Sequence, residues 1–365
     1  MRKIRTATVT WITYRNFGTY LQAYALQQVV ISLGYENAIL SDKNIVESIY
    51  NPWSIRFILG RTKAFVLNLF KKKDSKLEDS KRSYENFAKH YLNIDDSWKE
   101  TKELNDRYDI YLCGSDQIWS PNVPFHSFYY LSFTEKRKIA YAPSLGSYNY
   151  PEDKIPLIRP YLKNFSFLSV REVQGEKIIK DKFGLNCRTV IDPTLLLKKK
   201  DWEKLVTKKN DKEYVLCYLL SYNKAYLRFV RDFADRKGYE LRIFMTDSRY
   251  LNFADTPLYV GPQEFLNEIR NSSYLFTDSF HGSIFAIHFE VDFYTFKRFN
   301  DHTKNNQNSR IVNLFEKLNL LERFLSEKEL NHVEQLTEID YLSVKSRLDR
   351  EREDSLAFLK NALAE

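Results

Sequence analysis

The feature that most limits how this chain can fold is a repeated order of helix, glycine and strand. Three helical stretches each end at a glycine that is followed within a few residues by a strand-like run: 20–33 with Gly34, 176–183 with Gly184, and 225–237 with Gly238. Glycine ends helices well because it adopts the left-handed backbone conformation at little cost. Helices that alternate with strands in this way are typical of α/β proteins built on a parallel sheet.

The pattern divides into two blocks, and 365 residues is about the length of two domains. We expect a first domain over 1–197, with a helical, basic insertion at about 45–105. The second domain is expected over 198–365, with a charged helical tail from about 327 that can cross back onto the first. The expected strands of the first domain are 6–13, 38–40, 109–113, 138–142, 167–170 and 188–191. Those of the second are 214–220, 241–245, 257–260, 274–277 and 291–296.

Composition excludes several other classes of protein. The chain has only 10 glycines but 25 tyrosines and 26 phenylalanines, which is the composition of a packed globular protein and not of a low-complexity one. Its three cysteines, Cys113, Cys187 and Cys217, are too few and too scattered for a disulfide framework or a zinc site. No apolar run is long enough to span a bilayer, and the threonine-rich N-terminus does not resemble a secretory signal. We therefore expect a cytoplasmic protein.

The net charge of +8 is concentrated in one segment. Residues 51–82 hold nine Lys and Arg but only three Asp and Glu, interleaved with aromatic and aliphatic residues. This mixture is expected of a helix that lies on an anionic membrane surface, and equally of a helical insertion with a solvated basic end. Binding to nucleic acid is not expected, because no groove-reading or RNA-stacking motif accompanies the charge.

In open parallel sheets, ligands bind beyond the carboxyl ends of the strands, so the turns after the strands are the candidate site. The first such turn contains Asn16 and Gly18, the second contains Ser115, Asp116 and Gln117, and a third contains Ser144. Each has an alternative structural interpretation. A glycine can simply permit a turn, and Ser115 or Asp116 can cap a helix.

The fourth turn carries the strongest signal. Asp278, Ser279, His281, Gly282 and Ser283 stand between an expected strand and an expected helix. An imidazole at a helix N-terminus, beside the backbone N–H groups of Gly282 and Ser283, favours an anionic ligand.

Two arginines, Arg171 and Arg310, are candidates to support that anion. Arginine can hold a carboxylate or phosphate through two parallel hydrogen bonds. Either one can equally serve in an ion pair.

Six strings, in order, resemble the polysaccharide pyruvyl transferase family over about residues 6–325. They are NFGTYLQAYAL from 16, YLCGSDQIW from 111, KIAYAPSLG from 138, SVRE from 169, VIDPTLLL from 190 and TDSFHGSIFAI from 277. The resemblance implies two Rossmann-like parallel-sheet domains that face a cleft, an architecture similar to that of GT-B glycosyltransferases. Many members have Ala-Ser where this chain has Pro143-Ser144, which puts the shape of the acceptor cleft in question.

The resemblance also implies a reaction. The pyruvyl group of phosphoenolpyruvate moves onto two hydroxyls of a sugar, a cyclic ketal forms and phosphate leaves. Arg171, Arg310 and the helix that begins at Gly282 become candidates for the donor's two anionic groups. His281 is expected to act as acid or phosphate contact and Asp116 to orient or deprotonate the acceptor hydroxyl, while Asp278 is an alternative partner that holds the His281 ring. No metal and no cofactor besides the donor substrate are expected.

Two other functions remain as alternatives. A GT-B glycosyltransferase would use a nucleotide sugar in a similar fold, and a non-catalytic glycan-binding protein would use the cleft only for binding. A lipid-linked sugar acceptor in capsule or exopolysaccharide synthesis would suit a peripheral position on the inner membrane face through residues 51–82.

Overall fold

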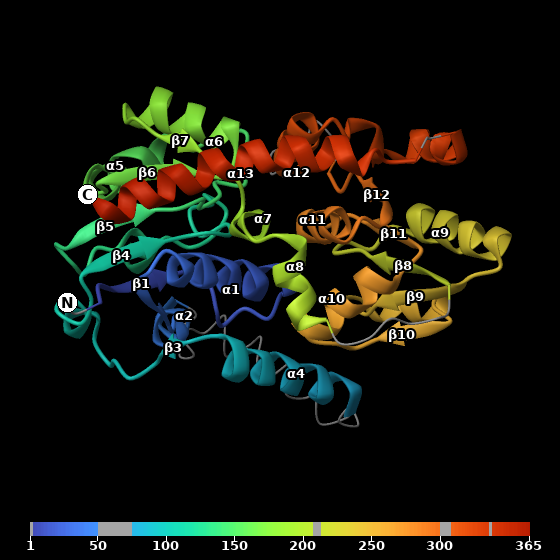
Figure 1. Cartoon of the computed structure of the whole chain (residues 1–365), viewed down its shortest axis with the longest axis horizontal. Coiled ribbons are helices and arrows are strands. Elements are labelled where there is room, and N and C mark those ends of the chain that lie inside the picture. Colours follow the sequence, from blue (N-terminus) through green and yellow to red (C-terminus); the bar gives the residue numbers. More distant parts are fainter. Residues whose placement is uncertain (1–2, 50–74, 207–212, 300–307, 336–337) are drawn as a thin grey trace.

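The computed structural model describes residues 3–49, 75–206, 213–299, 308–335 and 338–365. It shows two α/β domains, each with a parallel sheet between helices (Figure 1). The predicted fold class of two Rossmann-like domains is confirmed. The strands of the first sheet are β1 (Arg5–Val9), β2 (Glu36–Leu40), β3 (Ile94–Asp95), β4 (Ile110–Cys113), β5 (Arg137–Ala140), β6 (Phe167–Val170) and β7 (Arg188–Thr189). Those of the second are β8 (Tyr214–Tyr218), β9 (Glu240–Phe244), β10 (Thr256–Leu258), β11 (Tyr274–Thr277), β12 (Asp292–Phe296) and β13 (Phe324–Leu325).

Both sheets place their earliest strand near the middle. The first has the order β3-β2-β1-β4-β5-β6-β7 and the second has the order β10-β9-β8-β11-β12-β13. The strand order therefore reverses beside β1 and beside β8, which is where ligands bind in such sheets. Two strands, β3 and β13, were not predicted, because two residues are too few to show an alternating pattern.

The described helices are α1 (Phe17–Ser32), α2 (Lys43–Ile49), α4 (Ser75–Tyr91), α5 (Ile155–Lys163), α6 (Val173–Ile178), α7 (Pro193–Leu196), α8 (Lys199–Trp202), α9 (Lys224–Lys237), α10 (Pro262–Asn271), α11 (Phe280–Phe289), α12 (Ser309–Leu318) and α13 (Tyr341–Ala364). The helices predicted from the sequence are present, and others that it did not predict, such as α5, α10 and α12, accompany them. Gly184 and Gly238 end helical segments with φ of 69° each, as the sequence predicts. In the described part of the chain, no helix combines the length and the apolar character needed to cross a membrane.

One hydrophobic core runs through both domains. All ten residues of α11 are buried, and α1 is buried along most of its length, because each helix packs on a sheet and on the opposite domain. Phe17 of α1 stacks on Phe265 of α10 with ring centroids 4.3 Å apart. Burial of apolar side chains at this boundary stabilises the arrangement of the two domains as well as each fold.

Two helices also cross the domain boundary (Figure 1). In the insertion, α4 packs on α10, and Ser80 Oγ donates to the Val260 carbonyl at 2.9 Å. The tail crosses back, as the sequence allows: Ser355 Oγ in α13 accepts from Ile191 N–H at 3.0 Å. The apolar and basic residues 51–74, on which the membrane-surface interpretation mostly depends, lie outside the described residues.

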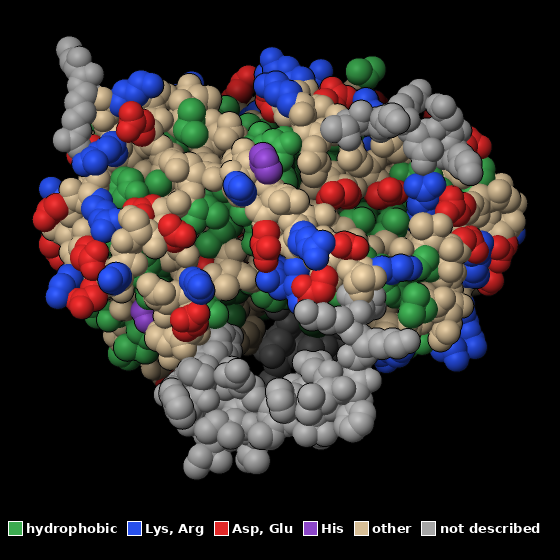
Figure 2. Space-filling model, turned by 90° about the horizontal axis from the view of Figure 1, so that it is seen from below, with side chains coloured by type: hydrophobic (Ala, Val, Ile, Leu, Met, Phe, Trp, Pro, Cys, Tyr) green, Lys and Arg blue, Asp and Glu red, His purple; other side chains and the backbone are tan. Residues whose placement is uncertain are grey.

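On the described surface seen in Figure 2, Lys and Arg side chains alternate with Asp and Glu. In this view, the described residues therefore form no patch of purely positive or purely negative charge.

Candidate functional site

A cavity of about 580 Å³ lies between the two domains. Its first-domain wall consists of Trp11, Thr13, Tyr14, Asn16, Thr19, Asp42, Val46, Ile49, Asp116, Gln117, Val123, Pro124 and Tyr129. Its second-domain wall consists of Leu220, Asp278, Ser279, Phe280, His281, Arg298, Phe299, Asn308, Arg310 and Ile311. Most of these residues follow strands of the two sheets, so the strand-end rule locates the cavity correctly.

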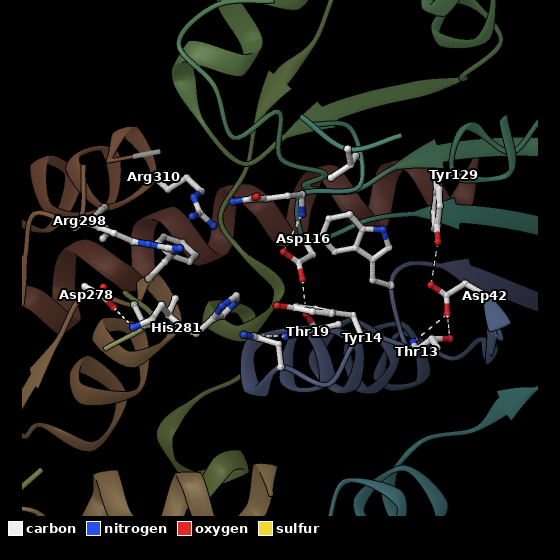
Figure 3. Close-up of a pocket in the computed structure, with 18 of the residues that line it drawn as sticks. Thr13, Tyr14, Thr19, Asp42, Asp116, Tyr129, Asp278, His281, Arg298 and Arg310 are labelled. Atoms are coloured by element: carbon white, nitrogen blue, oxygen red, sulfur yellow. Dashed lines mark hydrogen bonds between the residues drawn. The ribbon is translucent and has the colours of Figure 1, made fainter. Parts of the chain in front are cut away.

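The two walls carry opposite kinds of side chain (Figure 3). Arg298 and Arg310 give the second-domain wall two cations, beside the imidazole of His281 and the carboxyl group of Asp278. On the first-domain wall, Asp42 and Asp116 supply carboxylates beside the aromatic rings of Trp11 and Tyr14. The cavity can therefore hold an anion on one side and a hydroxyl-rich molecule on the other.

His281 enters the cavity from the first turn of α11. Ser279, two residues before His281, caps this helix, because its Oγ accepts from Gly282 N–H at 3.3 Å. The side chain of His281 is largely buried, since the residue is only 7% exposed. Its Nε2 lies 3.6 Å from Oδ2 of Asp192. On the opposite edge of the ring, a Cβ added to Gly18 would overlap Nδ1. Both Gly18 and Asp192 belong to the first domain's part of the chain.

Asp278 does not hold the His281 ring, which corrects the role predicted for it. Its two carboxylate oxygens accept from the backbone N–H groups of Leu220 at 2.6 Å and Ser221 at 3.1 Å, in the loop after β8. Asp192 takes the place beside the imidazole instead. Burial raises the pKa of Asp278 to about 6, although the backbone donors act in the opposite direction. Asp278 still lines the cavity.

Asp192 is a fully buried carboxylate with several partners. Oδ1 accepts from Thr194 N–H at 2.9 Å and its hydroxyl at 2.6 Å, while Oδ2 accepts from Arg171 Nη1 at 2.5 Å. Burial acts against ionisation here, but His281 and Arg171 outweigh it and hold the pKa of Asp192 well below its usual range.

Arg171 fulfils the ion-pair role that the sequence left open. Besides Asp192, it contacts Glu172, with Nε 3.3 Å from Oε1, and its guanidinium lies 4.7 Å from the ring centre of Phe280. It is absent from the described residues that line the cavity. The prediction that Arg171 binds substrate directly therefore needs correction: it lies behind Phe280, where Asp192 and Glu172 neutralise it.

The cations on the cavity wall are Arg310, as predicted, and Arg298, which was missed. Burial lowers the pKa of Arg310 to about 10, and the nearby charge of Arg171 adds to the effect. Arg298 donates from Nε to Ser221 Oγ at 2.7 Å. It stands two residues after β12, so the strand-end rule that selected the other turns also applies to it.

Asp116 lies on the facing wall. Its Oδ2 accepts from Thr19 Oγ1 at 2.6 Å and its Oδ1 from Gln117 N–H at 2.8 Å. Asn16 caps α1 by accepting from Gly18 N–H at 2.9 Å. Asn16, Asp116 and Gln117 line the cavity as predicted, and Thr19 joins them.

Five other predicted residues support the cavity and are not among its described lining residues: Gly18, Ser115, Ser144, Gly282 and Ser283. Ser115 Oγ donates to the Ala142 carbonyl at 2.8 Å, and Ser144 Oγ to Glu172 at 2.5 Å. The N–H groups of Gly282 and Ser283 are used inside the cap by Ser279. The amides that a helix leaves without internal partners at this end of α11 are those of its first two residues, Phe280 and His281.

Several other missed residues lie on the first-domain wall. Asp42 accepts from Thr13 N–H at 3.0 Å and from the Tyr129 hydroxyl at 3.0 Å, and burial raises its pKa. It follows β2, so its position gave a usable signal. Trp11 and Tyr14 also follow β1, which ends at Val9. The predicted strand extended to residue 13 and so placed Trp11 inside it.

Among the residues that the structure describes, no three His, Cys, Asp or Glu side chains form a group that could hold a metal ion. Independence from metals stays a prediction.

Comparison with known proteins gives one family. The family model described as polysaccharide pyruvyl transferase matches residues 16–298. Among curated proteins, none matches the chain.

Solved structures match the fold at low identity. A protein from Listeria monocytogenes described as a UDP-N-acetylglucosamine 2-epimerase shares 13% identity at a TM-score of 0.50, covering 96% of this chain and 91% of its own. An alpha-glucosyltransferase in complex with UDP and DNA shares 10% at 0.51, covering 98% and 95%. The S. aureus MnaA–UDP structure shares 11% at 0.50, covering 96% and 94%. These likenesses show the two-domain fold.

Proposed function

The chain belongs to the polysaccharide pyruvyl transferase family, and from this premise we propose that it transfers the pyruvyl group of phosphoenolpyruvate to a sugar. The acceptor is a sugar of a cell-surface polysaccharide or of its lipid-linked precursor. Two of its hydroxyls lose their protons and form C–O bonds to the central carbon of the donor. One proton ends on the methylene carbon, which becomes a methyl group, and the other ends on the phosphate, which leaves as its C–O bond breaks. The observation that carries the proposal is the cavity whose two walls differ in charge.

The donor belongs on the second-domain wall. Phosphoenolpyruvate has a carboxylate and a phosphate, so it needs two cationic or N–H-rich subsites. Arg298, Arg310 and the first amides of α11 supply these subsites around one cavity. The lowered pKa of Arg310 reflects a buried cation close to other cations, which an anion would relieve.

The acceptor belongs on the first-domain wall. The carboxylate of Asp116 can orient or deprotonate a hydroxyl, and the aromatic rings of Trp11 and Tyr14 can cover the apolar face of a sugar ring. His281 stands between the two groups of residues and acts as the acid for the methylene carbon or as a phosphate contact. Phosphoenolpyruvate is a consumed substrate in this scheme, with no further cofactor.

Phosphate release from phosphoenolpyruvate across a panel of acceptor saccharides tests the proposal directly. We expect release only with an accepted sugar, and a mass gain equal to a pyruvyl ketal. Thermal shift provides a second measurement, in which phosphoenolpyruvate should stabilise the protein. Stabilisation by nucleotide sugars alone, with no phosphate release, would favour the glycosyltransferase alternative.

Two variants test the assigned roles. His281→Gln and Asp116→Asn should each lower kcat about 100-fold or more, the usual effect of losing a group that transfers a proton. His90→Gln is the matched control, because His90 is exposed on α4. Full activity in His281→Gln would remove the acid from the mechanism and support a binding-only protein.

A lipid-linked acceptor would place the enzyme on a membrane surface, and the basic residues in 51–82 support that part of the proposal. Co-sedimentation with anionic vesicles should fall when Lys71, Lys72 and Lys73 are replaced by alanine. Equal pelleting of both proteins would contradict electrostatic attachment.

A further inference from the structure

The ring of His281 belongs to the second domain, yet the groups nearest its two nitrogens come from the first. Nε2 is buried and has no hydrogen-bond partner within 3.5 Å among the described residues, and the carboxylate of Asp192 lies 3.6 Å away. The opposite edge of the ring lies against Gly18 at the start of α1. Neither neighbour was expected from the sequence to act on the imidazole.

The two oxygens of Asp192 have separate tasks. Oδ1 caps α7 by accepting from Thr194, which fixes the carboxylate relative to the backbone. Oδ2 faces Arg171 and His281 together. A carboxylate held in this way can act on an imidazole without touching a substrate.

We propose that Asp192 is a positioning residue that keeps the proton of neutral His281 on Nε2, which leaves Nδ1, on the edge beside Gly18, as the nitrogen that gains and loses the second proton. A bare nitrogen facing an ionised carboxylate is repelled, whereas an N–H is attracted. The neutral ring therefore carries its hydrogen towards Asp192. Protonation adds a second hydrogen at Nδ1, and this is the one that can leave. Gly18 leaves room for that edge, because any side chain there would overlap the ring.

Other charged and titratable groups surround the ring and its cavity. They are Asp116 after β4, Arg171 and Glu172 after β6, Asp278 after β11, Arg298 after β12 and Arg310 in α12. Asp192 is the nearest described carboxylate to Nε2, so its removal should have a specific effect.

Nitrogen-15 NMR of histidine-labelled full-length protein tests the inference without substrate, with the His281 signals assigned by their loss in His281→Gln. We expect neutral His281 to show a protonated Nε2 and a bare Nδ1. In Asp192→Asn, the midpoint of the His281 titration should fall by about one pH unit or more, because a carboxylate partner favours the charged form. A wild-type ring protonated on Nδ1, or an unchanged midpoint in the variant, would overturn the proposal.

Thr194→Val is the matched control. It removes the hydroxyl that donates to Asp192 Oδ1 but keeps the carboxylate charge, so it should lower thermal stability and leave the titration midpoint within about 0.3 units. An equal shift of the midpoint in both variants would assign Asp192 a structural role only. If Asp192→Asn does not fold, Gly18→Ala provides the second test, since it displaces the Nδ1 edge and should also change the titration.

The catalytic consequence rests on the proposed function. Asp192→Asn should lower kcat for phosphate release at least tenfold and leave KM for phosphoenolpyruvate within a factor of about three. Failure of the proposed function would appear as no phosphate release by the wild type. The NMR measurement would still decide which nitrogen of neutral His281 carries the proton.

Discussion

Arg171 and Arg298 show how two arginines that each follow a strand acquire different tasks. Arg171 is enclosed and faces two carboxylates, Asp192 and Glu172, whereas Arg298 lines the cavity and uses one nitrogen to donate to Ser221. A buried arginine between carboxylates holds structure together, and an arginine on a cavity wall can meet an anion. At the sequence level both simply follow strands, so the difference depends on partners that only the folded chain supplies.

Replacing each of these arginines by glutamine should therefore have a different effect. Arg171→Gln leaves buried carboxylates unpaired and should lower the free energy of unfolding by about 3–5 kcal/mol, measured by denaturant titration. Arg298→Gln should change stability by less than about 1 kcal/mol. It should raise KM for phosphoenolpyruvate about 10- to 100-fold, the size of a charge-assisted hydrogen bond. A large loss of stability in Arg298→Gln, or a raised KM with normal stability in Arg171→Gln, would contradict these two roles.

Asp278 predicts a pH dependence of stability. Its pKa is about 6 in the folded protein, against 3.8 ordinarily, so the folded state binds the proton more tightly than the unfolded state. Stability from this group is present below about pH 4 and is lost as pH rises to about 6, by about 3 kcal/mol. The difference in unfolding free energy between wild type and Asp278→Asn should change by about this amount between pH 4 and pH 6. A constant difference would show that Asp278 ionises normally.

At the scale of elements, the sequence predicted most strands and the helices that end at glycines, because their signals are local. Alternating or helical apolar patterns and terminal glycines need no tertiary partner. The packing of α4 on α10 has no such signal, since it depends on two segments about 180 residues apart that fit closely. A Cβ on Gly261 would lie 2.5 Å from the Cβ of Ser83, so this glycine permits the approach of α4.

Gly261→Ala should separate these two helices and lower the free energy of unfolding by about 1–3 kcal/mol, the usual cost of overpacking. Ser83→Gly should recover part of the loss in the double variant, although glycine in a helix itself costs about 1 kcal/mol. A double-mutant cycle measures this coupling. Strict additivity of the two changes would indicate that the helices do not meet as described.

At the scale of the whole molecule, the core that spans both domains and the crossing of α13 should make the protein unfold as one unit. In α13, Leu359 is fully buried in that shared core, and Arg352 donates from Nε to the Leu195 carbonyl at 2.8 Å. The sequence predicted two parallel sheets and a returning tail, but the extent of contact between them depends on side chains that meet only after folding.

Leu359→Ala should lower stability by about 2–5 kcal/mol and shift a single unfolding transition, measured by calorimetry and by domain-specific probes together. Leu342→Ala in the same helix is the control, because its side chain is 83% exposed. Two separate transitions in the wild type would show that the domains are stabilised independently.

The imidazole of His281 belongs to the second domain, and the groups that contact its two edges belong to the first. A displacement of about 1 Å between the domains would misplace His281 from Asp192 and Gly18 long before either sheet loses its strands. Variants that loosen the domain boundary should therefore lose turnover at temperatures at which their secondary structure is intact, which makes activity a sensitive measure of how firmly the two domains are joined.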